Sequence, residues 1–174
     1  DASNLERNLY LATQLLEMGG PLVLAFNMSD VAKARGYSFS VRRLSGLLGV
    51  PIVRTIGNRR RGIEELLKAA VAAADEGKRA VERQARCRFG REIEPHLERV
   101  QQALGEAGLD GQARWHAVKL LEADEPTQRA LRERLGERLE GIEQELETAR
   151  RQVRAVRGGD RLEILLAERR YGFI

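Results

Sequence analysis

Four consecutive residues, Asn27-Met28-Ser29-Asp30, follow a short apolar run and have types and a spacing that suit contact with a nucleotide base. The carboxylate of Asp30 can accept two parallel hydrogen bonds from a flat pair of N–H groups. Guanine presents such a pair at N1 and N2, whereas adenine does not. The amide of Asn27 can donate and accept on the opposite edge of the same base. The spacing therefore predicts guanine specificity at this loop.

The same loop has a second interpretation, and a later loop bears on the choice. Asn and Asp often form turns after a strand, and either can cap a helix that begins near residue 30. The later loop, from Thr55 to Asn58, contains Gly57, which lets a backbone N–H approach a base carbonyl closely. The three arginines that follow it either face phosphates or form a solvated loop surface.

The first half of the chain alternates helical and strand patterns. Ser3 and Glu6 have the spacing of a capping box, and Ser40 is placed to cap another helix. Short apolar runs bounded by helix breakers predict buried strands. The expected strands span residues 21–26 and 50–55, and the expected helices span 5–16, 29–35, 41–48 and 62–76. This order predicts a parallel sheet whose strand-end loops share one edge, so the two candidate loops are expected to meet.

The second half of the chain carries only helical patterns. Apolar positions recur at helical spacing, and we expect Gly158-Gly159 to end a long helix and Asp160 to cap the last one. The expected fold class is therefore α/β with a truncated parallel sheet over residues 1–76, followed by an all-α helical bundle over 77–174, mostly helical overall. The amphipathic segments lie at 93–104, 115–121, 126–135, 137–156 and 161–174.

Composition limits the possible functions. The 174 residues include 43% hydrophobic residues, enough for a core, and one cysteine, which excludes an internal disulfide. The net charge of +4 comes from 30 basic and 26 acidic residues, and it allows nucleic-acid binding without indicating it. The two histidines lie in separate predicted helices without a cysteine at metal-binding spacing, so no metal site is expected.

The chain lacks the sequence motifs of phosphate chemistry. Neither Gly-x-x-x-x-Gly-Lys-Ser/Thr nor Asp-x-x-Gly occurs, so the backbone cradle for phosphates and the Mg²⁺ ligands are missing. We therefore expect no catalytic residues and no GTP hydrolysis by the chain alone, and only weak GDP or GTP binding. The chain begins at Asp1 and not at Met, which suggests a piece of a longer protein.

Several segments resemble the ferrous iron transport protein B family. They are residues 1–19, the Asn-Met-Ser-Asp loop, and the segments "LLGVPIVRTIGNRRRGIEELL", "RWHAVKLLEAD" and "AERRYGFI". The resemblance implies the C-terminal part of a P-loop-type GTPase domain over 1–76 and a helical regulatory domain, proposed to favour GDP, over 77–174. It implies guanine contacts from Asn27, Met28, Asp30, Ile56 and Gly57, with GTP or GDP as cofactor and Mg²⁺ in the intact parent.

One departure from the family pattern stands at the second loop. The family usually has Ser-Ala or Ser-Thr where this chain has Ile56-Gly57, so a hydroxyl that would brace the loop is lost and the loop gains flexibility. Met28 stands where most GTPases have Lys. From this comparison we expect weakened guanine affinity.

The resemblance also implies partners and a location. The family is a bacterial Fe²⁺ transporter, which places this region on the cytoplasmic face of the inner membrane. The implied partners are the missing first half of the GTPase domain and the membrane pore domain, and no nucleic acid is expected. A homo-oligomer or strand-swapped assembly would cover the open edge of the strand at 21–26. Two alternatives stay open: a helical protein-interaction module without nucleotide binding, and an RNA-associated GTPase fragment.

Overall fold

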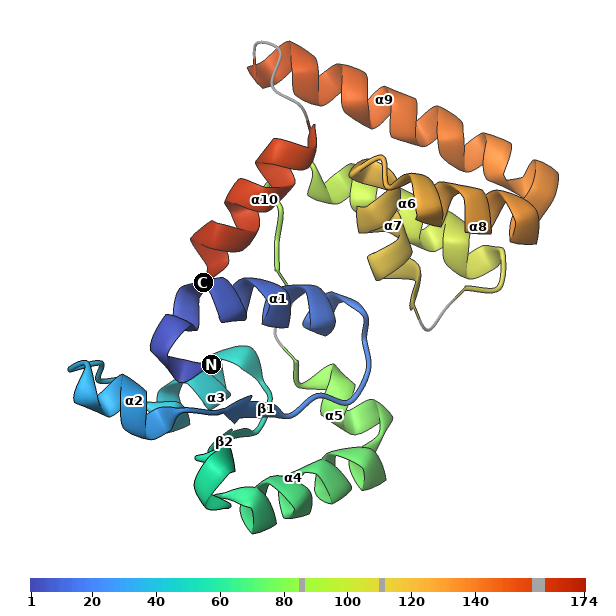
Figure 1. The fold of residues 1–174 in the computed structure, drawn as a ribbon. Coiled ribbons are helices and arrows are strands. Elements are labelled where there is room, and N and C mark those ends of the chain that lie inside the picture. Colours follow the sequence, from blue (N-terminus) through green and yellow to red (C-terminus); the bar gives the residue numbers. More distant parts are fainter. Residues whose placement is uncertain (85–86, 110–111, 158–161) are drawn as a thin grey trace. The chain divides into compact units, whose positions relative to one another are not determined.

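The computed structural model describes residues 1–84, 87–109, 112–157 and 162–174. The chain forms two compact units, Asp1–Arg86 and Cys87–Phe173, each with its own elements (Figure 1). The predicted boundary at residues 76 and 77 stays a prediction, although the contacts group the short helix after it with the first unit. Among the described helices, none is both long and apolar enough to span a bilayer.

The first unit is built on two parallel strands, as predicted. β1 (Leu24–Phe26) pairs with β2 (Ile52–Arg54), and Phe26 lies opposite Arg54 in the register. Both strands are shorter than the apolar runs that predicted them. β2 begins after Pro51 because proline has no N–H to donate to the neighbouring strand. The carbonyl of Pro51 still accepts a hydrogen bond from the Leu24 amide.

Five helices surround this short sheet in the first unit (Figure 1). Ser40 caps one of them as predicted, because its Oγ accepts from the Arg43 amide at 3.2 Å. The capping box at Ser3 is wrong. Asp1 accepts from both the amide and the hydroxyl of Ser3 at 2.8 Å, which produces a 3₁₀ turn (Ala2–Asn4) before the first helix. The helices are α1 (Leu5–Glu17), α2 (Ser29–Ala34), α3 (Val41–Leu48), α4 (Ile63–Glu76) and α5 (Lys78–Glu82).

The second unit contains helices joined by turns and loops, with no strand among its described residues, as the sequence predicted. Its long helix presents a buried stripe of Leu139, Ile142, Leu146, Ala149 and Val153 to the core. The expected break at Gly158-Gly159 and the cap at Asp160 lie outside the described residues. The helices are α6 (Glu94–Glu106), α7 (Ala113–Leu121), α8 (Glu125–Leu135), α9 (Leu139–Arg157) and α10 (Leu162–Phe173).

A buried arginine joins α10 to α7 within this unit. Arg170 is 1% exposed, and its guanidinium bonds the carboxylate of Glu122. It also lies 5.5 Å from the ring centre of Phe89, a residue with no exposed surface. Because a buried charge needs a partner, this pairing fixes where α10 packs.

A second polar cluster joins α6 to α9. Buried His96 contacts Glu145 through Nδ1 at 2.7 Å, and Arg99 donates to the same carboxylate at 2.9 Å. Burial alone raises the pKa of Glu145, but the hydrogen bonds and charges of Arg99 and His96 outweigh it, so this pKa lies below its ordinary value of 4.5. Among the described residues, no group of three or more His, Cys, Asp or Glu side chains is placed to hold a metal ion.

Candidate functional site

The two candidate loops meet at the carboxyl edge of the sheet. Because the strands are parallel and Phe26 lies opposite Arg54, the residues that follow each strand emerge side by side. The backbone continues this pairing for one more step, since the Thr55 amide donates to the Phe26 carbonyl at 3.0 Å. The sheet register therefore brings Asn27 next to the loop that begins at Thr55.

Asn27 ties the two loops together. Its Oδ1 accepts from the Gly57 amide at 3.0 Å and from the Thr55 hydroxyl at 3.3 Å. Its backbone carbonyl accepts from the Ala2 amide at 2.8 Å, which attaches the N-terminal turn to the same loop. Asn27 does not cap α2, because the N-cap position belongs to Met28. The bonds to Gly57 and Thr55 use only Oδ1, so the Nδ2 group of this exposed side chain can donate to a ligand.

Met28 makes the turn from the strand into α2. Its backbone is left-handed (φ 58°), and its side chain is 40% exposed. The next residue, Ser29, donates to the Thr55 carbonyl from both its amide, at 3.3 Å, and its hydroxyl, at 3.1 Å. These bonds hold the first turn of α2 against the end of β2, and they leave Met28 at the surface of the loop.

Asp30 lies in the first turn of α2. One carboxylate oxygen accepts from the Val31 amide at 3.0 Å, and the other lies 4.0 Å from Nη1 of Arg59. The side chain is 33% exposed, so solvent or a ligand can reach it. Asp30 therefore bonds the first turn of α2, as the capping interpretation predicted for this loop, whereas Asn27 makes no capping bond.

The Ile56-Gly57 loop is closed on itself. Ile56 and Arg61 exchange backbone hydrogen bonds at 3.0 and 3.3 Å, and a single 3₁₀ turn (Gly57–Arg59) lies between them. Gly62 ends the loop with φ +77°, and a Cβ there would lie 2.1 Å from the Arg54 carbonyl oxygen. Gly57 is different, because a Cβ there would make ordinary contact with the Asn27 amide at 3.4 Å.

Sequence reasoning missed Thr55 and Ser29. Thr55 is 3% exposed and bonds three groups of the first loop through its amide, carbonyl and hydroxyl. A hydroxyl residue directly after an apolar strand carries no signal of its own. The register of the two strands is the information that would have identified it, since it places Thr55 opposite Asn27.

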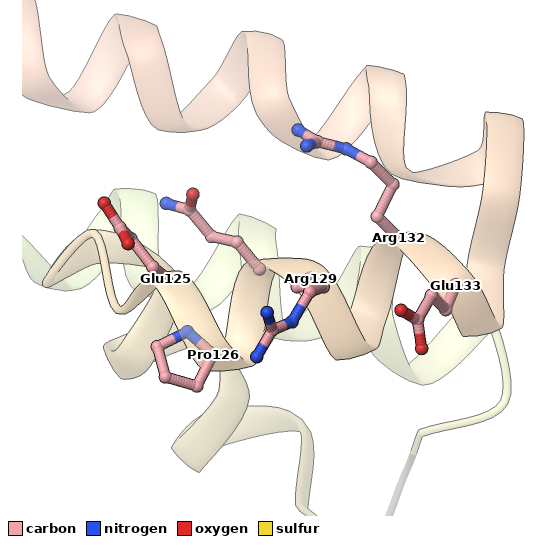
Figure 2. A pocket seen from close by; sticks show the side chains of 6 residues that line it. Glu125, Pro126, Arg129, Arg132 and Glu133 are labelled. Carbon is pink, nitrogen blue, oxygen red and sulfur yellow. The ribbon is translucent and has the colours of Figure 1, made fainter.

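The first unit and the second unit each carry a surface hollow lined by charged side chains. The first, of about 640 Å³, adjoins Asp30 and Ile56 and is also lined by Lys33, Arg54 and Arg61. The second, of about 610 Å³, runs along α8 and carries both signs of charge (Figure 2). Its lining includes Glu125, Pro126, Arg129, Arg132 and Glu133, and Arg132 donates to Glu143 of α9.

Comparisons with known families divide the chain at nearly the same place as its contacts do. A family model described as ferrous iron transport protein B matches residues 1–70. A second, described as the FeoB cytosolic helical domain, matches residues 89–174. Both models describe parts of one kind of protein, and together they leave only residues 71–88 unmatched.

Curated relatives are much longer than this chain. An Fe(2+) transport protein A/Fe(2+) transporter FeoB fusion protein of Porphyromonas gingivalis is 36% identical over 186 residues, covering 100% of the chain and 21% of that protein. The Fe(2+) transporter FeoB of Escherichia coli is 50% identical over 66 residues, covering 38% of the chain and 8% of that protein. The chain therefore spans about a fifth or less of the relatives it matches.

Solved structures share the fold. An NFeoB mutant of S. thermophilus bound to GMPPNP is 32% identical with a TM-score of 0.85, covering 99% of the chain and 64% of that structure. Another mutant bound to GDP is 33% identical, also with a TM-score of 0.85, covering 99% of the chain and 63% of that structure. The predicted combination of a partial sheet and a helical unit is confirmed by this likeness.

Proposed function

Because this chain belongs to the ferrous iron transport protein B family, we propose that it carries the guanine-reading part of the nucleotide site of a GTP-regulated Fe²⁺ transporter. In this proposal Asp30 accepts from N1 and N2 of guanine, and the amide of Asn27 contacts the opposite edge of the base. Met28, Ile56 and Gly57 line the base. The proposed cofactor is GDP or GTP, and Mg²⁺ would be held by parts of the whole protein other than this chain.

The observation that carries the proposal is the hydrogen bonding of Asn27. A residue that served only as a turn former would bond its own loop or cap α2. Asn27 instead bonds the Gly57 amide and the Thr55 hydroxyl across the sheet edge, and so joins the two loops predicted to contact the base. Loops that are already joined need less ordering when a ligand arrives, which lowers the entropic cost of binding.

The loss of a hydroxyl at Ile56 is offset in this chain. Thr55 and Ser29 supply hydroxyl hydrogen bonds across the same sheet edge, at 3.3 and 3.1 Å. Gly57 has room for the Cβ that the family's usual Ala would bring. We therefore expect the Ile56-Gly57 pair to weaken guanine affinity less than the sequence suggested.

We further propose that the helical unit, Cys87–Phe173, regulates the nucleotide site and couples it to a membrane pore on the cytoplasmic face of the bacterial inner membrane. The open edge of β1 is part of the same proposal. Among the described strands, β1 pairs only with β2, so its other edge has no strand beside it, next to half-buried Leu22 and Val23. We expect the other half of the GTPase domain, or a swapped strand from a second copy, to cover it.

The test is base selectivity in the complete protein. Fluorescent GDP and fluorescent ADP are titrated into the natural protein and into Asp30→Ala. Each lost hydrogen bond to a charged group is worth about 1.5–3 kcal/mol, so GDP affinity should fall by on the order of 10²-fold or more while ADP affinity stays weak. Asp75→Ala, which removes an exposed carboxylate from α4, is the matched control and should bind GDP normally.

Two outcomes would reject the proposal. Equal GDP and ADP affinities in the natural protein would favour the protein-interaction module, and an unchanged GDP affinity in Asp30→Ala would remove Asp30 from the site. The chain by itself is expected not to turn over GTP, because it has no phosphate-binding loop. Release of phosphate by the pure chain at a rate above that of buffer would contradict this expectation.

A further inference from the structure

The positive charge of this protein is concentrated in one segment. Residues 18–63 contain eight Lys and Arg residues and a single acidic residue, Asp30. The rest of the chain contains 22 basic and 25 acidic residues, so outside this segment the chain is slightly acidic. The small overall charge of +4 therefore conceals a local excess of seven positive charges.

The fold gathers part of this excess around one hollow. Lys33, Arg54 and Arg61 line the hollow of about 640 Å³ beside α2, and Arg59 lies 4.0 Å from Asp30 on its margin. We call these four residues the basic surface. All four are exposed, and the single carboxylate among them can balance only one of their charges. The remaining basic residues of the segment, Arg35, Arg42, Arg43 and Arg60, are also exposed.

The hollow on α8 shows what a balanced surface looks like in the same protein. There two arginines, Arg129 and Arg132, lie between two glutamates, Glu125 and Glu133, along α8 (Figure 2). Charges of both signs at helical spacing cancel one another at a distance and attract no particular partner. The basic surface has one carboxylate, Asp30, against four basic side chains, so its net positive field extends into solvent over about a Debye length.

We propose that the basic surface docks on the anionic phospholipid surface of the membrane. This inference rests on the proposed function, in which the chain lies at the cytoplasmic face of a membrane transporter. Phosphodiester headgroups match exposed Lys and Arg side chains, which attract them without a shaped pocket. Tyr37, 56% exposed, also lines the hollow and offers a ring with a polar tip, the kind of side chain enriched at membrane interfaces.

Lipid is favoured over nucleic acid by the side chains present. Proteins that bind single strands combine a basic groove with several aromatic platforms on which successive bases stack. The hollow beside the basic surface has two aromatic side chains in its lining: Tyr37 is exposed, and Phe39 packs its ring against Phe26 at 5.5 Å. A surface with several basic side chains and one exposed ring is suited to binding anionic lipid headgroups, and it lacks the several rings needed to stack the bases of a nucleic acid.

The experiment measures sedimentation of the chain with vesicles, in the absence of nucleotide. The vesicles are phosphatidylcholine alone, or phosphatidylcholine mixed with phosphatidylglycerol, at low salt and at about 0.15 M salt. The test variant removes three charges (Lys33→Gln, Arg59→Gln, Arg61→Gln) and keeps Arg54, which bonds the Phe39 carbonyl. The matched control removes three exposed charges elsewhere (Lys78→Gln, Arg79→Gln, Arg129→Gln), and circular dichroism checks that both variants fold.

The natural chain should bind the anionic vesicles, bind them less as salt rises, and ignore neutral ones. Each charge removed from the basic surface is expected to weaken partitioning about fivefold, and three together on the order of a hundredfold. The control has the same net charge as the test variant and should stay within about threefold of the natural chain. Equal losses in both variants would show that only net charge matters and would overturn the proposal.

Two further outcomes would also overturn it. One is equal binding to neutral vesicles, and the other is salt-sensitive binding of a short RNA with no binding to anionic vesicles. The guanine proposal is tested separately, because vesicle binding needs no nucleotide. Loss of lipid binding with intact GDP selectivity would reject the docking surface alone, and loss of GDP selectivity with intact lipid binding would reject the guanine site alone.

Discussion

Removing the Thr55 hydroxyl tests whether the two loops are braced as the hydrogen bonds indicate. Thr55→Val has nearly the same shape, keeps the backbone bonds to Phe26 and Ser29, and removes only the 3.3 Å bond to Asn27. Thr55 is 3% exposed, so valine fits the same buried position without leaving a polar group unpaired, and Oδ1 of Asn27 keeps its bond from the Gly57 amide. A net hydrogen bond is worth about 1 kcal/mol, and the free energy of unfolding of the first unit should fall by about that amount.

Asn27→Ala removes both bonds of the brace. The Thr55 hydroxyl then lies buried without its acceptor, and the exposed Gly57 amide turns to water, so the expected loss is about 2 kcal/mol. The double variant should lose no more than Asn27→Ala alone, since the two single changes share one bond. The coupling energy in the cycle is then about 1 kcal/mol.

The assay combines urea unfolding with amide hydrogen exchange. Unfolding gives the free energies for the cycle, and exchange at the Gly57 amide reports its bond to Asn27 directly. Exchange at Gly57 should accelerate in Asn27→Ala and change little in Thr55→Val. Additive losses in the double variant, or an unchanged Gly57 exchange rate in Asn27→Ala, would refute the brace.

Three further predictions concern a glycine pair, a lowered pKa and a buried ion pair. Gly57→Ala should stabilise the first unit by up to about 1 kcal/mol, since there is room for its Cβ. Gly62→Ala should destabilise the first unit by at least about 2 kcal/mol, because φ is positive there and the new Cβ would lie 2.1 Å from the Arg54 carbonyl oxygen. Thermal melts that rank the two variants the other way would contradict this prediction. The pKa of Glu145 is lowered in the folded state, so its stabilisation is complete above 4.5 and is lost as pH falls below that value. Glu145→Gln should therefore lose less stability than the natural chain between pH 6 and pH 3 in urea titrations, and identical pH slopes would exclude this role. Arg170→Ala should cost about 2–5 kcal/mol, because it leaves a cavity beside Phe89 and takes from Glu122 one of its two cationic partners, the other being Lys119. A loss below about 1 kcal/mol by chemical unfolding would show that the buried arginine is not structural.

Much of the fold could be predicted from periodicity and helix breakers. The alternation of helices with two strands, the parallel pairing of those strands, and the change to helices without strands in the described residues of the second half were confirmed by the structure. These features depend on spacing along the chain, which the sequence displays directly. The short helix α5 was not predicted. The strand ends were predicted less well, because pairing partners decide where a strand stops and Pro51 lies at that point.

The candidate site could be predicted in part. The residue types at Asn27 and Asp30 indicated guanine contact, and that role stays a prediction. The partner of Asn27 could not be read from the sequence, since Gly57 lies 30 residues further along and reaches it only through the sheet register. The capping box at Ser3 failed for a related reason, because Asp1 competes for the same amide and the spacing of Ser3 and Glu6 does not reveal it.

By itself, then, the sequence indicated both strands and most of the helices, and it supplied the prediction that Asn27 and Asp30 contact a base. Hydrophobic period and breaker residues act within a few residues, so no folded context is needed to interpret them. The tertiary structure alone decided which groups satisfy one another, such as Asn27 with Thr55, and Arg170 with Glu122 across 48 residues. A buried polar group is costly unless it is hydrogen-bonded, and these groups become buried only when distant segments of the chain pack together.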